Sequence, residues 1–209
     1  MADIKIGRMV LGSVGTNCYF VYRDGSSQVI FFDPADRGDY IATQLADRGF
    51  SVSSIYLTHG HFDHIWGNNK LRELSGAKVH ALDAEKALCE DARLNVSAQA
   101  GRAYTAIVDE YLKDGQEIVE GDITIKVIAT PGHTEGSCCY YIEEAGILIC
   151  GDTLFQESVG RTDLPTGSGS KLNRSVQDKL FVLPDETKVY PGHGDSTSIG
   201  HEKMYNPFF

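Results

Sequence analysis

The pattern of hydrophobic and polar positions divides the chain into many short segments. Apolar runs bounded by Gly, Asp and Pro follow one another over most of its length, which predicts a protein rich in β-strands. Arg23-Asp24-Gly25 is typical of a hairpin turn, so we expect early strands to pair with their neighbours in the chain. The predicted strands cover residues 4–12, 17–23, 28–32, 52–57, 78–82, 116–119, 123–129, 137–142, 147–150 and 187–190.

Helical spacing is confined to fewer segments. Ile41 and Leu45 stand four positions apart and predict a helix over 39–47, with Gly49 as its stop. Because strands outnumber helices and are mostly joined by hairpins, we expect an α+β fold, a single domain over 1–209 with two sheets between helices. Three more helices are predicted over 66–74, 84–90 and 175–183, a long loop forming a lid or cleft wall over 91–112, and a Gly-rich loop over 160–170.

Composition and charge narrow the classes of partner. The chain is 42% hydrophobic and 23% charged, as in ordinary globular proteins. Its net charge of −10 argues against nucleic acid, because phosphate backbones require clustered Lys and Arg. No apolar run approaches the roughly 18 residues that a membrane span needs, so no membrane partner is expected. The first residues show no secretory signal, and five scattered cysteines predict a reduced, cytoplasmic protein.

One short segment concentrates metal-ligand chemistry. It runs Thr58-His59-Gly60-His61-Phe62-Asp63-His64, directly after the predicted strand 52–57. Imidazole and carboxylate are the usual ligands of zinc and similar divalent ions. Residues two apart in an extended chain point the same way, so His59 and His61 are expected to reach one metal. A bend into a helix after them would turn Asp63 and His64 toward a second position.

Three further residues follow the ends of later strands. His133 follows the strand 123–129, Asp152 follows the strand 147–150, and His193 follows the strand 187–190. Neighbouring Gly and Pro give tight turns at all three places, and loops at one sheet edge commonly form sites. Five histidines and two aspartates are too many donors for one tetrahedral site, and they suit two metals roughly 3.5–4 Å apart.

The spacing suggests how these donors divide between the two metals. We expect His59, His61 and His133 on the first metal, and Asp63, His64 and His193 on the second, with Asp152 bridging both. Each metal would then keep an open position for water, whose pKa falls toward about 7 on zinc. Zinc is the expected metal, with iron or manganese as alternatives for the same ligands.

Several other residues have both a structural and a functional interpretation. His80 lies inside a predicted strand and His201 in a polar tail, so both are expected to lie outside the site. Cys138 and Cys139 lie in an apolar strand and are expected to behave as small buried hydrophobes.

Two polar residues leave both interpretations open. Asp33 follows the strand 28–32 and either orients a ligand imidazole or forms a turn before Pro34. Arg161 either binds an anionic group of the substrate or forms a loop salt bridge with Asp163.

Taken in order, these motifs resemble the metallo-β-lactamase fold superfamily. The resemblance implies a four-layer αββα sandwich with metals at one edge of the two sheets. Within the superfamily, the chain is most similar to the glyoxalase II-like hydrolases, the hydroxyacylglutathione hydrolase type. Full-length glyoxalase II enzymes add a C-terminal helical domain that binds glutathione, and we expect a short form without it. The matching segments are Gly132-His133-Thr134-Glu135-Gly136-Ser137, Gly151-Asp152-Thr153-Leu154-Phe155, Gly160-Arg161-Thr162-Asp163-Leu164-Pro165 and Asn206-Pro207-Phe208.

This resemblance implies hydrolysis of a small-molecule thioester such as S-lactoylglutathione by a metal-bridging hydroxide. Asp63 is expected to orient the hydroxide besides binding metal, and Arg161 to hold a carboxylate of the thiol. An iron-dependent persulfide dioxygenase of the same fold is an alternative, because the Gly160–Asp163 segment resembles those enzymes too. A lactonase or β-lactamase-type hydrolase is a third possibility. The pattern predicts neither the physiological thioester nor the oligomeric state.

Overall fold

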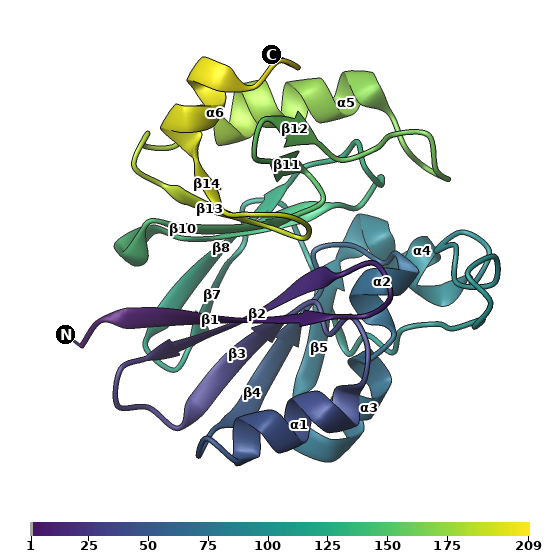
Figure 1. Ribbon diagram of the computed structural model, residues 1–209, viewed down its shortest axis with the longest axis vertical. Coiled ribbons are helices and arrows are strands. Elements are labelled where there is room, and N and C mark those ends of the chain that lie inside the picture. The colour runs from purple at the N-terminus through teal and green to yellow at the C-terminus, as the bar shows by residue number, and fades with distance from the viewer. Residues whose placement is uncertain (1) are drawn as a thin grey trace. The chain divides into compact units, whose positions relative to one another are not determined.

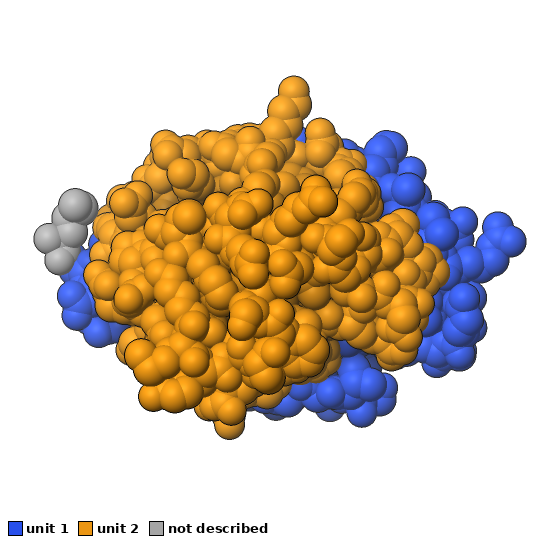
Figure 2. Space-filling view, turned by 90° about the horizontal axis from the view of Figure 1, so that it is seen from above, with its two compact units in different colours: residues 1–81, 86–111 blue, residues 82–85, 112–209 orange. Residues whose placement is uncertain are grey.

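The structure is a computed structural model that describes residues 2–209, and its contacts divide the chain into two compact units. Unit 1 comprises residues 1–81 and 86–111, and unit 2 comprises residues 82–85 and 112–209 (Figure 2). The prediction of a single domain over 1–209 stays a prediction, and each unit is described by itself.

Unit 1 is built on a mixed sheet whose strands lie in chain order (Figure 1). The first three strands pair antiparallel, whereas β3, β4 and β5 run parallel. Its strands are β1 (Ile4–Leu11), β2 (Thr16–Arg23), β3 (Gln28–Phe32), β4 (Ser51–Tyr56), β5 (Lys78–Leu82) and β6 (Glu110–Leu112).

Helices pack against the central strands of this sheet. The helices α1 (Gly38–Ala46) and α3 (Asn68–Ser75) contact each other and β4, while α2 (Phe62–Ile65) and α4 (Lys86–Glu90) are short. The apolar face of α1 buries Ile41 and Leu45 against residues such as Phe31 and Ile55. Burial of such aliphatic side chains contributes about 1.5–3 kcal/mol each, so this core holds the strand ends in place.

Unit 2 has a second six-stranded sheet in the order β14-β13-β10-β9-β8-β7. Along β8, Ile123, Ile125 and Val127 are buried and alternate with exposed residues, whereas β9 and β10 are buried throughout. The pattern is that of a sheet with covered central strands and half-exposed edges. Its strands are β7 (Glu117–Glu120), β8 (Ile123–Ala129), β9 (Cys138–Ile142), β10 (Ile147–Gly151), β13 (Lys188–Pro191) and β14 (Thr197–Ser198), with a separate ribbon of β11 (Leu154–Phe155) and β12 (Ser158–Val159).

The helical elements of unit 2 cover one face of its sheet (Figure 1). They are α5 (Gly169–Arg174), its π-helical continuation η3 (Ser175–Leu180) and α6 (Ile199–Tyr205). Unit 2 also contains two short 3₁₀ turns, η1 (Asp83–Glu85) and η2 (Glu143–Ala145). Val176, Leu180 and Ile199 from these elements pack with Cys150 and Val189 of the sheet.

Two predicted helices are wrong in their bounds. The helix predicted over 66–74 begins later, at Asn68, as α3, and the short helix α2 lies before it, on the other side of Gly67. The amide of Gly67 donates to the Pro34 carbonyl at 2.8 Å, and a Cβ there would lie 2.8 Å from that oxygen, so this contact interrupts the helix. The helix predicted over 175–183 begins earlier, at Gly169, because the Ser168 side chain caps it by accepting from the Lys171 amide. The Gly-rich loop predicted over 160–170 is correspondingly shorter.

The last part of the chain holds elements that the pattern did not predict. Residues expected to form a polar tail contain β14 and α6, and α6 begins where the Ser198 side chain accepts from the His201 amide. The segment 91–112 is mainly irregular as predicted, but its end forms β6. Its role as a cleft wall stays a prediction.

Two expectations about apolar character can be compared with the structure. Among residues 2–209, no helix combines the length and apolar character needed to cross a bilayer. All five cysteines are buried, and burial raises the pKa of the Cys139 thiol to about 12. The expectation that Cys138 and Cys139 pack as buried hydrophobes is confirmed.

Candidate metal centre

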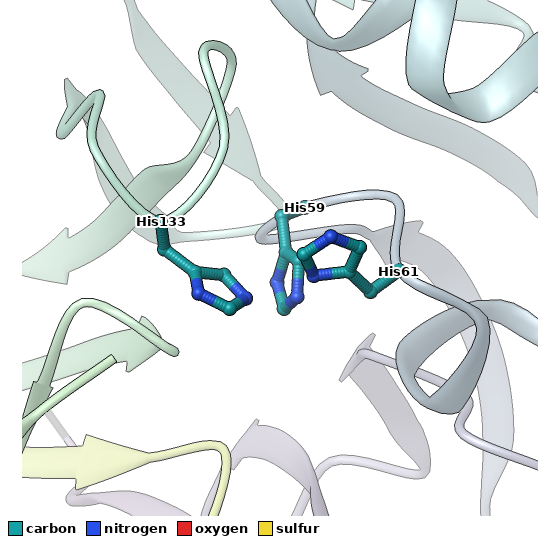
Figure 3. A group of neighbouring side chains, drawn as sticks. All are labelled: His59, His61 and His133. Atoms are coloured by element: carbon teal, nitrogen blue, oxygen red, sulfur yellow. The ribbon is translucent and has the colours of Figure 1, made fainter. Parts of the chain in front are cut away.

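The histidine segment of unit 1 follows the end of β4. Its residues turn from extended backbone at His61, where φ is −64° and ψ is 150°, into the short helix α2. The ring centroids of His59 and His61 are 4.9 Å apart with planes at 87°, and those of His59 and His64 are 4.1 Å apart. Metal-binding atoms of His59 lie within 4.8 Å of those of His61 and of His64. The segment therefore gathers its imidazoles at the end of one strand; Figure 3 shows His59 and His61 there, and His133 in the loop after β8.

Asp33 anchors these imidazoles from the end of β3. Its buried carboxylate accepts the Thr58 amide at 2.7 Å, the Thr58 hydroxyl at 2.7 Å and Nδ1 of His64 at 2.9 Å. The Thr58 hydroxyl in turn lies 3.1 Å from Nδ1 of His59. Asp33 has a φ of 51°, a left-handed conformation that costs about 1–3 kcal/mol for a non-glycine residue. The interpretation of Asp33 as the residue that orients a ligand imidazole is the one that this geometry supports.

Asp63 lies on the first turn of α2, beside His64. Its Oδ2 is 3.8 Å from Nε2 of His64, and the hydroxyl of Thr16 donates to the same oxygen at 3.4 Å. Thr16 is fully buried at the start of β2. Nothing in the sequence pattern pointed to Thr16, because its contact with Asp63 joins residues that are far apart in the chain.

The three later donors lie together in unit 2. Nε2 of His133 is 3.6 Å from Oδ2 of Asp152, and Nε2 of His193 is also 3.6 Å from that oxygen. The Asp152 carboxylate thus lies between two imidazoles that come from different strand ends. The side chain of His193 is 27% exposed, whereas that of His133 is 3% exposed, so the three donors differ in their access to solvent.

A backbone carbonyl orients His133. Its Nδ1 donates to the Arg161 oxygen at 2.7 Å, which turns Nε2 toward Asp152. The Arg161 carbonyl comes close because the preceding residue, Gly160, packs against the Asp152 backbone and the His133 ring. A Cβ on Gly160 would lie 1.8 Å from the backbone carbonyl oxygen of Asp152 and 3.2 Å from Nδ1 of His133. Only a residue without a side chain can pack this closely, which explains why the Gly160–Asp163 segment begins with glycine.

The turn that carries His133 is held by a buried acid. The carboxylate of Glu85, which is 1% exposed, accepts the Thr134 hydroxyl at 3.0 and 2.9 Å. The Ser137 hydroxyl lies 2.7 Å from the same Thr134 oxygen and accepts the Thr134 amide at 3.0 Å. Glu85 was missed because it precedes this turn by about fifty residues in a segment with no site-like pattern.

The donor set fits divalent metal ions. Distances of 3.6–3.8 Å between Nε2 and carboxylate oxygen exceed hydrogen-bond lengths. They are close to the separation of about 3.4 Å expected of two donors that each lie roughly 2.0–2.1 Å from one tetrahedral ion. Nδ1 of His64 and of His133 is held by an acceptor, which leaves Nε2 to face the other donors, as metal-binding histidines usually do. Each unit therefore contributes His and Asp donors of the kind that bind metal ions.

The remaining predicted residues lie in other contacts. The side chain of Arg161 is 62% exposed and forms two hydrogen bonds with Asp163 at 2.7 and 2.8 Å. Its role in binding substrate stays a prediction. His80 lies on β5 and stacks on Tyr56 at 4.7 Å. The His201 side chain is 33% exposed, its Nε2 is 3.0 Å from Glu157, and it belongs to none of the donor groups, so only its place on helix α6 differs from the predicted polar tail.

The fold and the metal-binding residues can be compared with those of known protein families. The sequence pattern described as the Metallo-beta-lactamase superfamily matches residues 11–193. The chain therefore belongs to this superfamily, as a metallo-hydrolase with the predicted α+β fold.

Among curated relatives, the chain is similar to the probable metallo-hydrolase YqgX of Bacillus subtilis (strain 168). The two are 38% identical over 207 residues, with 98% of this chain and 97% of YqgX covered. It is also similar to the hydroxyacylglutathione hydrolase GloC of Haemophilus influenzae (strain ATCC 51907 / DSM 11121 / KW20 / Rd), with 31% identity and 92% of each chain covered.

Two solved structures are close in shape. The B3 metallo-β-lactamase BLEG-1 has a TM-score of 0.93 and 36% identity, with 98% of this chain and 99% of that chain covered. TTHA1623, solved in a di-iron-bound form, has a TM-score of 0.87 and 31% identity, with 97% and 100% covered.

Proposed function

We propose that the protein hydrolyses a small-molecule thioester, such as S-lactoylglutathione, with two divalent metal ions. The observation that carries the dinuclear part is the position of Asp152, whose Oδ2 lies 3.6 Å from both His133 and His193. A carboxylate between two imidazoles suits a ligand shared by two ions. The similarity to a hydroxyacylglutathione hydrolase over 92% of the chain supports the thioester part.

The proposed ligand division is the one that the sequence predicts. His59, His61 and His133 would hold one ion, Asp63, His64 and His193 the other, with Asp152 shared. Inside unit 1, the closeness of His59 to His61 and of Asp63 to His64 agrees with this division. The similarity to TTHA1623, which was solved with two irons, supports two ions over one. Zinc is proposed, and iron or manganese suit the same donors.

Bound ions would supply an activated water at neutral pH and polarise the acyl carbonyl. The protein's own residues would do the rest. The carboxylate of Asp63, which accepts a hydrogen bond from the Thr16 hydroxyl, would accept another from the attacking water and keep it aligned. In the reaction the water oxygen bonds to the acyl carbon, the carbon–sulfur bond breaks, and the departing sulfur takes a proton.

A panel of substrates run beside elemental analysis tests this proposal. Protein purified without added metal should contain about two metal ions per chain and should cleave S-lactoylglutathione or a related thioester. Removal of the metal with a chelator should abolish cleavage, and return of zinc should restore it. Oxygen uptake with glutathione persulfide, together with one iron per chain, would instead identify the dioxygenase alternative.

A second candidate is hydrolysis of β-lactams. It is favoured by the 36% identity and nearly complete coverage between this chain and the B3 metallo-β-lactamase BLEG-1. The same activated water would attack the lactam carbonyl. A chromogenic cephalosporin belongs in the panel for this reason, and a kcat/KM for it that exceeds that of every thioester would replace the first proposal with this one.

A further inference from the structure

A cavity of about 300 Å³ lies in unit 2 beside the segments that hold His133. This volume is at the small end of the range of roughly 300–1,000 Å³ for ligand sites. The cavity therefore has room for one small substituent of a substrate and not for a whole tripeptide such as glutathione. Its walls come from the end of β12 and the segment after it, from α5 and from residues 208 and 209: Val159, Gly160, Arg161, Thr162, Gly169, Leu172, Asn173, Phe208 and Phe209.

Two of these walls also contact the turn that carries His133. Gly160 lies against the Asp152 carbonyl and the His133 ring, and the Arg161 carbonyl accepts Nδ1 of His133. On the other wall, Leu172 of α5 packs on Gly132, where a Cβ would lie 2.3 Å from the Leu172 backbone. A group bound in the cavity would thus lie next to the residues that position the reacting end of the site.

The side chains of the lining are mainly apolar, and its one charged side chain is paired. Four side chains, those of Val159, Leu172, Phe208 and Phe209, are hydrophobic. The Arg161 guanidinium is already engaged by Asp163, and this contact lowers the pKa of the Asp163 carboxyl to about 2. The pair therefore stays ionised at neutral pH, so the one charged side chain of the lining, Arg161, already has a counter-ion in Asp163.

We propose that this cavity is a specificity pocket for the acyl substituent of the thioester, and that it takes an uncharged aliphatic or phenyl group. The inference rests on the proposed function, because it assumes that the substrate is a thioester. The acyl substituent is chosen over the thiol because a thiol such as glutathione carries ionised groups that this lining does not match. Short apolar acyl groups should therefore be better substrates than lactoyl.

The wild-type protein tests this with a series of thioesters of one thiol. Replacement of acetyl by butanoyl and then hexanoyl should raise kcat/KM by about fourfold per added methylene until the cavity is full. S-lactoyl and S-phenylacetyl thioesters of the same thiol complete the series, with phenylacetyl expected to exceed lactoyl. No dependence on acyl length would overturn the pocket and leave thioester hydrolysis intact.

A variant that fills the cavity makes the test specific. At Gly169 a Cβ would meet only the Thr162 hydroxyl, at an ordinary 3.4 Å, so Gly169→Leu should be tolerated by the backbone. It should lower the preference for hexanoyl over acetyl by about tenfold. Ser170→Leu is the matched control, because Ser170 is exposed on the same helix and outside the lining. If Gly169→Leu fails to fold, Asn173→Phe fills the same space from a half-exposed position.

Binding of phenylacetamide to the wild-type protein, followed by the NMR shifts of the Gly160 and Gly169 amides, separates the two proposals. Shifts that Gly169→Leu abolishes and Ser170→Leu keeps support the cavity, even if no thioester is cleaved; in that case only the thioester reaction is wrong. Thioester cleavage whose length preference survives Gly169→Leu, without amide shifts, overturns the pocket alone. Absence of both cleavage and shifts overturns both.

Discussion

The donors of the two units are built in different ways. In unit 1, His59, His61, Asp63 and His64 come from one continuous segment, and the buried carboxylate of Asp33 orients it. In unit 2, the donors come from three strand ends, and the orienting group of His133 is a backbone carbonyl. Donors on one short segment can be oriented by a single carboxylate, whereas donors on separate strands depend on the sheet and its turns to hold them in position. Mutations should therefore act in unit 2 mainly through the donors, and in unit 1 also through the anchor.

The largest effect is expected at Asp152, the residue that lies between two imidazoles of unit 2. Asp152→Ala should lower kcat/KM for the best thioester by about 10³-fold or more, because the proposed shared ligand is lost. Elemental analysis should show fewer metal ions per chain than in the wild type. Asp195→Ala removes an exposed carboxylate near His193 and serves as the control. Retention of full activity by Asp152→Ala would rule out the metal mechanism.

A smaller effect is expected at Asp33, the anchor of unit 1. Asp33→Asn keeps the shape but removes the charge that accepts Nδ1 of His64, so metal affinity should fall by about 10–100-fold. Competition with a chromogenic chelator measures this affinity. Asp47→Asn, an exposed position after α1, should leave it unchanged. If Asp33→Asn lowers thermal stability with no change in metal affinity, the anchor role is wrong.

The Glu85 contact should matter less, because it acts on the neighbour of a ligand. Thr134→Val removes the hydroxyl that donates to the buried Glu85 carboxylate and should destabilise the protein by about 1–3 kcal/mol. A several-fold rise in KM or loss of metal affinity should accompany it if the turn positions His133. Thr134→Ser restores the hydroxyl and should restore both quantities. A stability loss alone would make the contact purely structural.

The smallest effect is expected at an ion pair of unit 1 that touches none of the donors. Two hydrogen bonds from Arg72, at 2.5 and 2.8 Å, lower the pKa of the Asp109 carboxyl to about 2 from its ordinary 3.8. Because the folded pKa is depressed, the contribution is complete above pH 3.8 and is lost as the pH falls toward about 2. It should be about 1 kcal/mol, since the pair is partly exposed.

Urea unfolding of the wild type and of Asp109→Asn, measured between about pH 3 and pH 7, checks this contribution. The difference in unfolding free energy should be constant at the upper end of the range and shrink at the lower end. A difference that grows as the pH falls would contradict the assigned sign. Thioester hydrolysis at pH 7 should be unchanged in the folded variant.

Most of the strands could be predicted from the sequence. Strands 78–82 and 123–129 have the predicted bounds, because apolar runs between turn residues mark strands well. The donors were readable for a related reason: each comes directly after such a strand. Helix bounds were less predictable, since the break at Gly67 depends on a contact with Pro34 and the start of α5 on a cap by Ser168.

The supporting residues of the site were harder to predict than its donors. Thr16, Glu85 and the Arg161 carbonyl act through contacts between segments far apart in the chain, which no local pattern records. Asp33 could be suspected, because it follows a strand as the donors do. The side chain of Arg161 suggested an anion site, whereas in the structure its nearest carboxylate belongs to Asp163.

The central claim is that this member of the superfamily hydrolyses thioesters with two metal ions. Its most direct test is a titration of metal-free protein with zinc, in which hydrolysis of an acyl thioester is followed at each addition. We predict that activity rises to a plateau at about two zinc ions per chain and that Asp152→Ala never reaches it. Full activity at one ion per chain, or no thioester cleavage at any zinc content, would contradict the account.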